Sequence, residues 1–199
     1  MISIPADTEA LIFDCDGTLV DTLPLYLRAW QAALREVGGI EVDAAWFRER
    51  GGYAEQMLLA DVEKSFGITL NRPAIIAATR RRVRETIEGV RCNVPVITVV
   101  REWAGRVPLA VASSGSREVV EASLAAIGLL DVFSVIVTIE DVEHPKPAPD
   151  IYLLAARKLG VDPAHCVVFE DSHEGLKAAR AAGMTAEDVR PCSEFRVAS

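Results

Sequence analysis

The sequence predicts an α/β fold with three layers around a central parallel sheet, together with an inserted helical cap. The first observation is that short apolar runs alternate with helical patterns along most of the chain. This alternation is typical of parallel sheets that are covered by helices on both faces. The second is that no strand pattern occurs between residue 21 and about residue 90. We therefore expect a core domain of residues 1–20 and 94–199 and a helical cap domain of residues 21–93.

The strands of the sheet are predicted from apolar runs that end in turn residues. The first, Ala10–Phe13, is unbroken, as expected for a strand that is buried on both faces. Further strands are expected at 108–112, 133–139, 166–169 and 184–189.

The helices of the cap are predicted from apolar residues that recur at three- and four-residue steps. Leu23–Val37 has this pattern, and Gly38 with Gly39 ends it. Similar patterns cover 44–50, 54–66 and 73–87. In the pattern over 54–66, one buried face is expected to hold Met57, Leu58, Val62 and Phe66.

The core domain contains one segment of mixed signals. Residues 94–103 are rich in β-branched side chains, which favours a strand. Pro95, however, suits the first turn of a helix, and Ile97 and Val100 have helical spacing, so we predict a helix. Helices are also expected over 117–127 and from a Ser172 cap to Ala182, whereas the tail from Pro191 shows no clear element.

Length, composition and charge exclude several classes of protein. The chain has 199 residues, of which 50% are hydrophobic, so it can bury a sizeable core. Its net charge of −8 argues against a nucleic acid or a membrane as partner, because both require basic patches. No apolar run approaches the ~20 residues of a membrane helix, and the first ten residues lack a signal-peptide pattern. We expect a cytoplasmic protein, either a monomer or a small homo-oligomer.

The cysteines predict neither a zinc site nor a disulfide framework, because Cys15, Cys92, Cys166 and Cys192 are scattered without paired spacing. Cys15 lies between two aspartates. Their negative charge would hold its thiol protonated, so we interpret it as an unreactive residue.

Asp14 and Asp16 follow the first predicted strand directly, and Gly17 with Thr18 turns the chain away. Ligands of open α/β sheets bind beyond the carboxyl ends of the strands, so these aspartates are expected at an active site. One carboxylate can attack phosphorus to form an aspartyl-phosphate, while the other serves as acid or base. Two neighbouring carboxylates also attract Mg²⁺. The alternative is an ordinary Asp-Gly turn.

A second candidate stretch follows the strand at 108–112. Ser113, Ser114 and Gly115 lead from this strand into a helix. Small hydroxyls and backbone N–H groups at such a turn can form an anion site, although Ser/Gly clusters are also common as loops and caps.

Two further stretches carry charged groups. Lys146 stands in Pro145-Lys146-Pro147-Ala148-Pro149, and the prolines favour a fixed point charge that suits phosphate. His144 nearby is expected to be solvated. Glu170 and Asp171 follow the strand at 166–169 as a second acidic strand end. A metal site gathers its ligands from adjacent strands in this way.

The stretch Asp14-Cys15-Asp16-Gly17-Thr18-Leu19-Val20-Asp21 resembles the first motif of the haloacid-dehalogenase-like superfamily, most of whose members are Mg²⁺-dependent phosphatases. The other three stretches are similar to its second, third and fourth motifs. Within the superfamily the chain resembles the β-phosphoglucomutase-like subgroup, and more closely the bacterial fructose-1-phosphate phosphatase type. The resemblance implies a Rossmann-like core and a helical cap with hinges near 19–22 and 92–95.

The resemblance also implies roles for the motif residues. Asp14 is then the nucleophile, Asp16 the acid and base, and Lys146 a bridge between phosphate and Asp14. Ser113 binds phosphate through its side chain, with Ser114 and Gly115 offering backbone N–H groups. Mg²⁺ is held by the Asp14 carboxylate, the Asp16 backbone carbonyl and Asp171, with Glu170 helping through water.

The partner suggested by the resemblance is a small phosphorylated metabolite, such as fructose 1-phosphate or a related sugar or sugar-acid phosphate. The candidate contacts in the cap are Arg50, Tyr53, Gln56 and Arg82. Arg82 belongs to a basic block that includes Arg80, Arg81 and Arg84, for which a solvated helix face is the alternative.

Three other functions stay open. A haloacid dehalogenase would have no use for Asp16, Lys146 and Asp171 as a metal and phosphate set. A hexose-phosphate mutase shares the core residues, but its cap carries a histidine and a Gly-x-x-Arg stretch. Here those places hold Tyr26 and Gly51-Gly52-Tyr53-Ala54. A catalytically silent binding protein is the third, and the complete set of motif residues argues against it.

Overall fold

A computed structural model describes residues 2, 4–50 and 54–197. The chain divides into two compact units, one of Met1–Thr22 with Gly89–Ser199 and one of Leu23–Glu88. We call them the core unit and the helical unit.

The core unit is built on a five-stranded parallel sheet with the order β4-β3-β1-β5-β6. This result confirms the predicted α/β class. The strands are β1 (Ala10–Phe13), β3 (Leu109–Ser113), β4 (Val135–Thr138), β5 (Cys166–Glu170) and β6 (Thr185–Asp188). All four residues of β1, all five of β3 and all five of β5 are buried, which explains their unbroken apolar runs.

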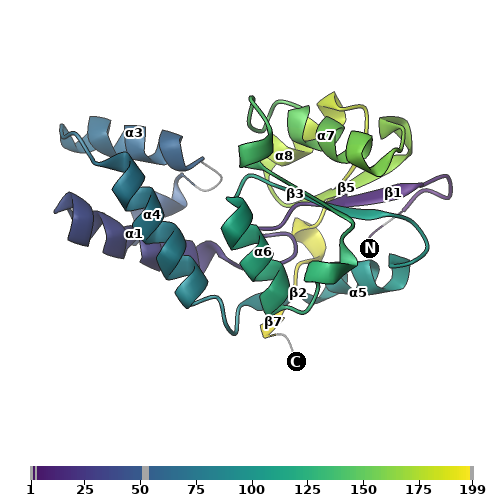
Figure 1. The fold of residues 1–199 in the computed structure, drawn as a ribbon, viewed down its shortest axis with the longest axis horizontal. Helices are drawn as coiled ribbons and strands as arrows, with labels where there is room; N and C mark the ends of the chain where they lie inside the picture. The colour runs from purple at the N-terminus through teal and green to yellow at the C-terminus, as the bar shows by residue number, and fades with distance from the viewer. Residues whose placement is uncertain (1, 3, 51–53, 198–199) are drawn as a thin grey trace. The chain divides into compact units, whose positions relative to one another are not determined.

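Helices cover both faces of this sheet. The helices of the core unit are α5 (Val94–Trp103), α6 (Arg117–Ala126), α7 (Asp150–Leu159) and α8 (His173–Ala181). Figure 1 shows α5 and α6 on one face and α7 and α8 on the other. Right-handed crossovers require this arrangement, because the strand order runs one way from β1 to β4 and the other way from β5 to β6. The order therefore reverses at β1, where α/β proteins bind their ligands.

Alternate side chains of the strands pack against the two helical layers. Ile12 and Val168 contribute to the core that includes Tyr152 of α7 and Ala178 of α8. On the opposite face, Phe13 stacks on Phe169 with ring centroids 4.7 Å apart.

Short 3-10 helices complete the connections of the core unit. They are η1 (Leu130–Val132), η2 (Ile139–Asp141), η3 (Pro163–His165) and η4 (Arg190–Cys192). Asp162 caps η3 by accepting from the backbone N–H of Ala164.

The helical unit contains α1 (Leu23–Gly38), α2 (Ala44–Arg48), α3 (Glu55–Phe66) and α4 (Arg72–Glu85). Its own hydrophobic core includes Trp30, Leu34, Leu59, Val62 and Ile75. Local signals set the ends: Asp43 caps α2, Asn71 caps α4, and Gly67 ends α3 in the left-handed conformation.

The predicted apolar face of α3 was partly wrong. Met57 is 54% exposed and Phe66 43% exposed, whereas Leu59, which is not on the predicted face, is buried together with Leu58 and Val62. The periodic pattern allows both sets, and packing against the other helices selects one.

The prediction that the tail forms no clear element was also wrong. β7 (Phe195–Val197) pairs antiparallel with β2 (Arg91–Asn93) as a separate small sheet. The buried Asn93 side chain fixes the tail: its Nδ2 donates to Ser193 Oγ at 3.2 Å, and its Oδ1 accepts from the Glu194 N–H at 3.1 Å. Such three-residue strands lack a recognisable sequence pattern, because a partner distant in sequence stabilises them.

The helix predicted at Val94–Trp103 is confirmed as α5, which buries Val96, Ile97, Val99 and Val100 on one side. Within the described parts of the chain, no helix has both the length and the apolar character needed to cross a membrane.

Candidate active site

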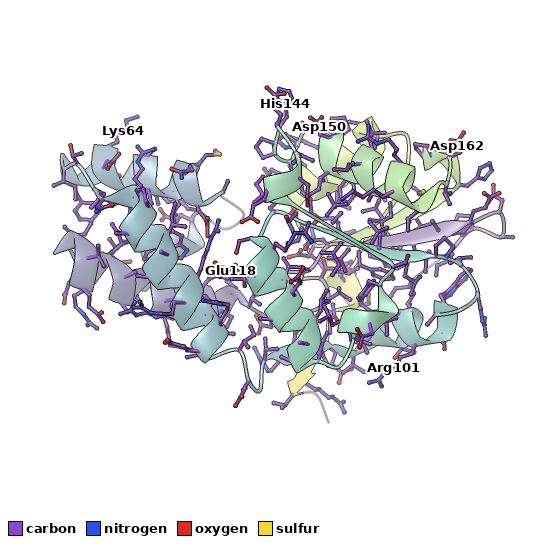
Figure 2. The ribbon with its side chains drawn as sticks, viewed as in Figure 1. Lys64, Arg101, Glu118, His144, Asp150 and Asp162 are labelled. Atoms are coloured by element: carbon purple, nitrogen blue, oxygen red, sulfur yellow. The ribbon has the colours of Figure 1, made fainter. Side chains whose placement is uncertain are left out.

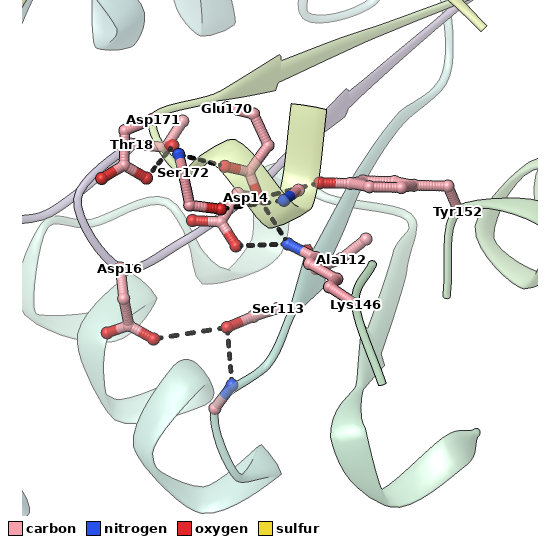
Figure 3. A network of polar contacts seen from close by, with 12 residues as sticks. Asp14, Asp16, Thr18, Ala112, Ser113, Lys146, Tyr152, Glu170, Asp171 and Ser172 are labelled. Carbon is pink, nitrogen blue, oxygen red and sulfur yellow. Dashed lines mark hydrogen bonds and ion pairs between the residues drawn. The ribbon is translucent and has the colours of Figure 1, made fainter. Parts of the chain in front are cut away.

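The predicted site residues of the core unit converge at the carboxyl ends of β1, β3 and β5 (Figure 3). Asp14 follows β1 directly, while Ser113 and Glu170 are the last residues of β3 and β5. Because these strands are neighbours in a parallel sheet, their ends bring together residues that lie far apart in the sequence.

Lys146 lies at the centre of this group and is almost fully buried. Its Nζ donates to Asp14 Oδ1 at 2.7 Å, to Glu170 Oε1 at 2.7 Å and to the Ala112 carbonyl at 3.1 Å. Burial alone would lower the pKa of Lys146, but the negative charges of Asp14 and Glu170 outweigh it, so the pKa is raised well above its usual value. Lys146 is therefore a buried cation that is bound by three acceptors.

Carboxylates outnumber cations around Lys146. Asp14, Glu170 and Asp171 each offer an oxygen within 4.8 Å of the others. Burial raises the pKa of Asp14 well above its usual value, although Lys146 opposes this shift. Burial, and then the charge of Glu170, raises the pKa of Asp171 to about 6. A divalent cation would relieve this crowding of negative charge, so the oxygen donors present fit Mg²⁺.

Both carboxylate oxygens of Glu170 accept hydrogen bonds from other protein groups. Its Oε1 accepts from Lys146 and from the Tyr152 hydroxyl at 3.1 Å, and its Oε2 accepts from the Ser172 N–H at 2.7 Å. Burial alone would raise the pKa of Glu170, but Lys146 and these hydrogen bonds lower it below its usual value. Glu170 therefore holds Lys146 in place. It also belongs to the acidic group formed by Asp14, Glu170 and Asp171.

Asp16 points away from Lys146 and faces different partners. Its Oδ1 accepts from the Thr22 hydroxyl at 2.5 Å, and its Oδ2 accepts from the Ser113 hydroxyl at 3.3 Å. Burial raises the pKa of Asp16, although the hydrogen bonds from Thr22 and Ser113 act against the shift. A carboxyl group whose pKa is raised in this way is suited to carrying a proton.

The Ser113–Gly115 turn lies beside Asp16. The Gly115 N–H donates to Ser113 Oγ at 3.0 Å, and Ser114 is half-buried. A side chain at position 115 would place its Cβ 3.0 Å from Asp16 Oδ2 and 3.3 Å from Ser113 Oγ. Glycine therefore keeps this turn close to the Asp16 carboxylate.

Several site residues escaped the sequence analysis. Thr18 donates to Asp171 Oδ1 at 3.1 Å, and Tyr152 contacts Glu170 from α7. A Cβ on Gly17 would lie 2.2 Å from Asp171 Oδ2, and one on Gly175 only 1.7 Å from Glu170 Oε1. A glycine in the first turn of a helix is unfavourable for helix stability, so Gly175 in the sequence could have indicated that another group approaches the helix closely there.

Two of the candidate contacts in the helical unit, Arg50 and Arg82, form ion pairs with acidic residues of the same unit. Arg50 pairs with Asp61 and stacks over the Trp46 ring at 3.8 Å. Arg82 pairs with Glu36 and donates to the Ala78 carbonyl at 3.2 Å. Gln56 is exposed, and Tyr53 lies outside the described residues.

Cys15 is buried, and burial followed by the charges of Asp16 and Asp14 raises the pKa of its thiol well above the usual value. An unreactive thiol was predicted, but burial rather than the neighbouring charge is the larger cause. His144 is 66% exposed, as expected, but its Nδ1 also lies 2.8 Å from Asp150 Oδ1 (Figure 2).

A buried lysine among carboxylates, at the reversal point of an open parallel sheet, is a candidate active site of an α/β protein. The family model of the haloacid dehalogenase-like hydrolases matches residues 8–183. The chain therefore belongs to that family.

Individual relatives agree with this membership. The chain is 38% identical over 180 residues to fructose-1-phosphate phosphatase YqaB of Escherichia coli (strain K12), covering 90% of this chain and 95% of the relative. It is 36% identical over 188 residues to hexitol phosphatase A of the same organism, covering 88% and 80%. The crystal structure of CbbY from Rhodobacter sphaeroides in complex with phosphate superimposes with a TM-score of 0.82 at 30% identity, covering 90% of this chain and 84% of that one.

Proposed function

We propose that this phosphoric monoester hydrolase removes phosphate from a small phosphorylated sugar through an aspartyl-phosphate intermediate and with Mg²⁺ as cofactor. The observation that carries the proposal is the 2.7 Å contact between Lys146 and Asp14, beside an Asp16 whose partners are instead Thr22 and Ser113. The two aspartates thus have different surroundings, which suits a nucleophile and a proton carrier.

Asp14 is the proposed nucleophile. Its Oδ1 is fixed by Lys146, which leaves Oδ2 to attack the phosphorus atom. The bond between phosphorus and the leaving oxygen breaks as the new bond to Asp14 forms. Lys146, the Ser113 hydroxyl and the backbone N–H groups of Ser114 and Gly115 are the proposed binding groups for the phosphate oxygens.

Asp16 is the proposed acid and base. In its protonated form it gives a proton to the leaving oxygen, so that the alcohol departs neutral. The resulting carboxylate then takes a proton from the water that attacks the aspartyl-phosphate, which releases inorganic phosphate and restores both aspartates. The hydrogen bond from Thr22 holds one oxygen of Asp16 during these transfers.

The proposed holders of Mg²⁺ are the Asp14 carboxylate, the Asp171 carboxylate and the backbone carbonyl of Asp16, with Glu170 acting through water. When bound, the ion would neutralise charge on the phosphate and on these carboxylates. The crowding of Asp14, Glu170 and Asp171, together with the raised pKa of Asp171, supports this proposal.

The proposed substrate class rests on the relatives named for fructose 1-phosphate and hexitol phosphates. We propose the helical unit as a cap that selects the sugar, with Arg50, Tyr53, Gln56 and Arg82 as candidate contacts. Arg50 and Arg82 would have to leave Asp61 and Glu36 to bind a substrate.

The test is phosphate release with and without Mg²⁺ from fructose 1-phosphate, β-glucose 1-phosphate, hexitol phosphates and a generic aryl phosphate. Mg²⁺-dependent release from one or a few sugar phosphates is expected. Conversion of β-glucose 1-phosphate to the 6-phosphate without net release would instead identify a mutase, which shares the core residues. No turnover of any ester would favour a silent binding protein.

A further inference from the structure

The Tyr152 hydroxyl is connected to the candidate active site by a hydrogen bond to Glu170. Tyr152 comes from α7 and is fully buried, and its hydroxyl lies 3.1 Å from Glu170 Oε1 (Figure 3). Because an ionised carboxylate has no proton to give, the hydroxyl is the donor. The ring itself packs in the apolar cluster with Ala155 and Val168. A phenylalanine would fill this space equally well, so packing alone does not require the hydroxyl.

The hydrogen bonds of Lys146 explain how the Tyr152 hydroxyl can affect the reaction. The ammonium has three N–H donors, and three acceptors use them: Asp14 Oδ1, Glu170 Oε1 and the Ala112 carbonyl. A substrate phosphate can therefore bind Lys146 only if an existing acceptor loosens its hold. Glu170 Oε1 is the acceptor that shares its charge with a second donor, the Tyr152 hydroxyl.

We propose that Tyr152 is a positioning residue for the phosphatase reaction: its hydroxyl weakens the hold of Glu170 on Lys146 and so frees the ammonium for Asp14 and the phosphate. Without the hydroxyl, Lys146 is the sole donor to Glu170 Oε1 among the residues that the structure describes, and the two charges bind each other more tightly. The lysine is then less available when negative charge builds up on the transferring phosphoryl group. This inference rests on the proposed function.

The test is Tyr152→Phe, assayed on the best substrate of the wild-type enzyme. We expect kcat to fall about tenfold, because a hydrogen bond to a charged group is lost where the transition state needs it. KM should change by less than about twofold, because the effect grows with charge in the transition state. The Mg²⁺ concentration for half-maximal activity should stay unchanged.

Ser123→Ala is the matched control for the loss of a buried hydroxyl. Ser123 is fully buried in α6, and its hydroxyl donates to the Val119 carbonyl at 2.8 Å, away from the acidic group. Both variants should lower the melting temperature slightly, but only Tyr152→Phe should lower kcat. An unchanged kcat in Tyr152→Phe would overturn the inference, and so would a rise in the Mg²⁺ requirement without a fall in kcat at saturating Mg²⁺.

A second test uses Glu170→Gln as background. A neutral amide no longer competes for Lys146 by charge, so Tyr152→Phe should then change the remaining kcat by less than about twofold. Equal effects of Tyr152→Phe in both backgrounds would contradict a role through Glu170. A wild-type chain that releases phosphate from no ester would refute the proposed function instead, so the two failures are distinguishable.

Discussion

Asp14 and Asp16 have the same side chain and stand two positions apart, yet their surroundings differ. Asp14 contacts Lys146, whereas Asp16 contacts Thr22 and Ser113. The sequence predicted two carboxylates at the end of a strand. Their division into two environments comes from three places: Thr22 shortly after β1, Ser113 at the end of β3 and the segment around Lys146 supply the partners.

Replacing Asp14 by asparagine should abolish turnover without unfolding the protein. The amide has nearly the same shape but cannot attack phosphorus, and its neutrality relieves repulsion from Glu170 and Asp171. We expect phosphate release to fall by at least about 1,000-fold, with a melting temperature equal to or above that of the wild type. Asp131→Asn, at an exposed position, is the control and should be fully active. Substantial activity in Asp14→Asn would disprove its assignment as the nucleophile.

The stability of the metal-free protein should depend on pH through Asp171. Its pKa is raised to about 6, first by burial, so between about pH 4 and 6 the folded state holds a proton that the unfolded state has released. The contribution of Asp171 to stability therefore falls as the pH rises through this window.

The measurement is the melting temperature between pH 4 and pH 7 with and without Mg²⁺. Asp171→Asn should flatten the fall seen in the metal-free wild type. Mg²⁺ at pH 7 should raise the melting temperature of the wild type and not that of Asp171→Asn. An equal Mg²⁺ effect on both proteins would place the metal elsewhere.

At the scale of elements, the buried strands and most helices follow from the sequence, because apolar periodicity and capping residues are local signals. The α5 segment shows how this works: Pro95 and the helical spacing of Ile97 and Val100 outweigh its β-branched composition. The exceptions are β7 and the buried face of α3, which depend on partners distant in sequence.

Helix α8 should tolerate no side chain at Gly175. Alanine normally stabilises a helix by about 1 kcal/mol relative to glycine. Here its Cβ would lie 1.7 Å from Glu170 Oε1, so Glu170 must move away from Lys146. We expect Gly175→Ala to lose most of the activity and roughly 1–3 kcal/mol of stability, measured by phosphate release and urea unfolding. Lys177→Ala, exposed on the same helix, should change neither; a stable and active Gly175→Ala would show that Glu170 need not stay in place.

At the scale of the whole molecule, the two units have separate hydrophobic cores. Leu59 is fully buried in the helical unit, and Leu59→Ala should cost about 2–5 kcal/mol there. Hydrogen exchange should therefore show lost protection in α1, α3 and α4, while β1, β3 and β5 keep theirs. Equal loss of protection in both units would mean that the chain unfolds as one cooperative body.

The sequence by itself determined the α/β class, the helical insertion and the positions of the acidic, serine and lysine motifs, because strand ends and turns are encoded locally. Only the tertiary structure decided which of these groups touch. The contacts of Lys146 with Asp14 and Glu170, the approach of Tyr152, and the glycines that make room all join residues from different strands and helices. Local patterns specify where a side chain stands along its own element, whereas its neighbours depend on how the elements pack together.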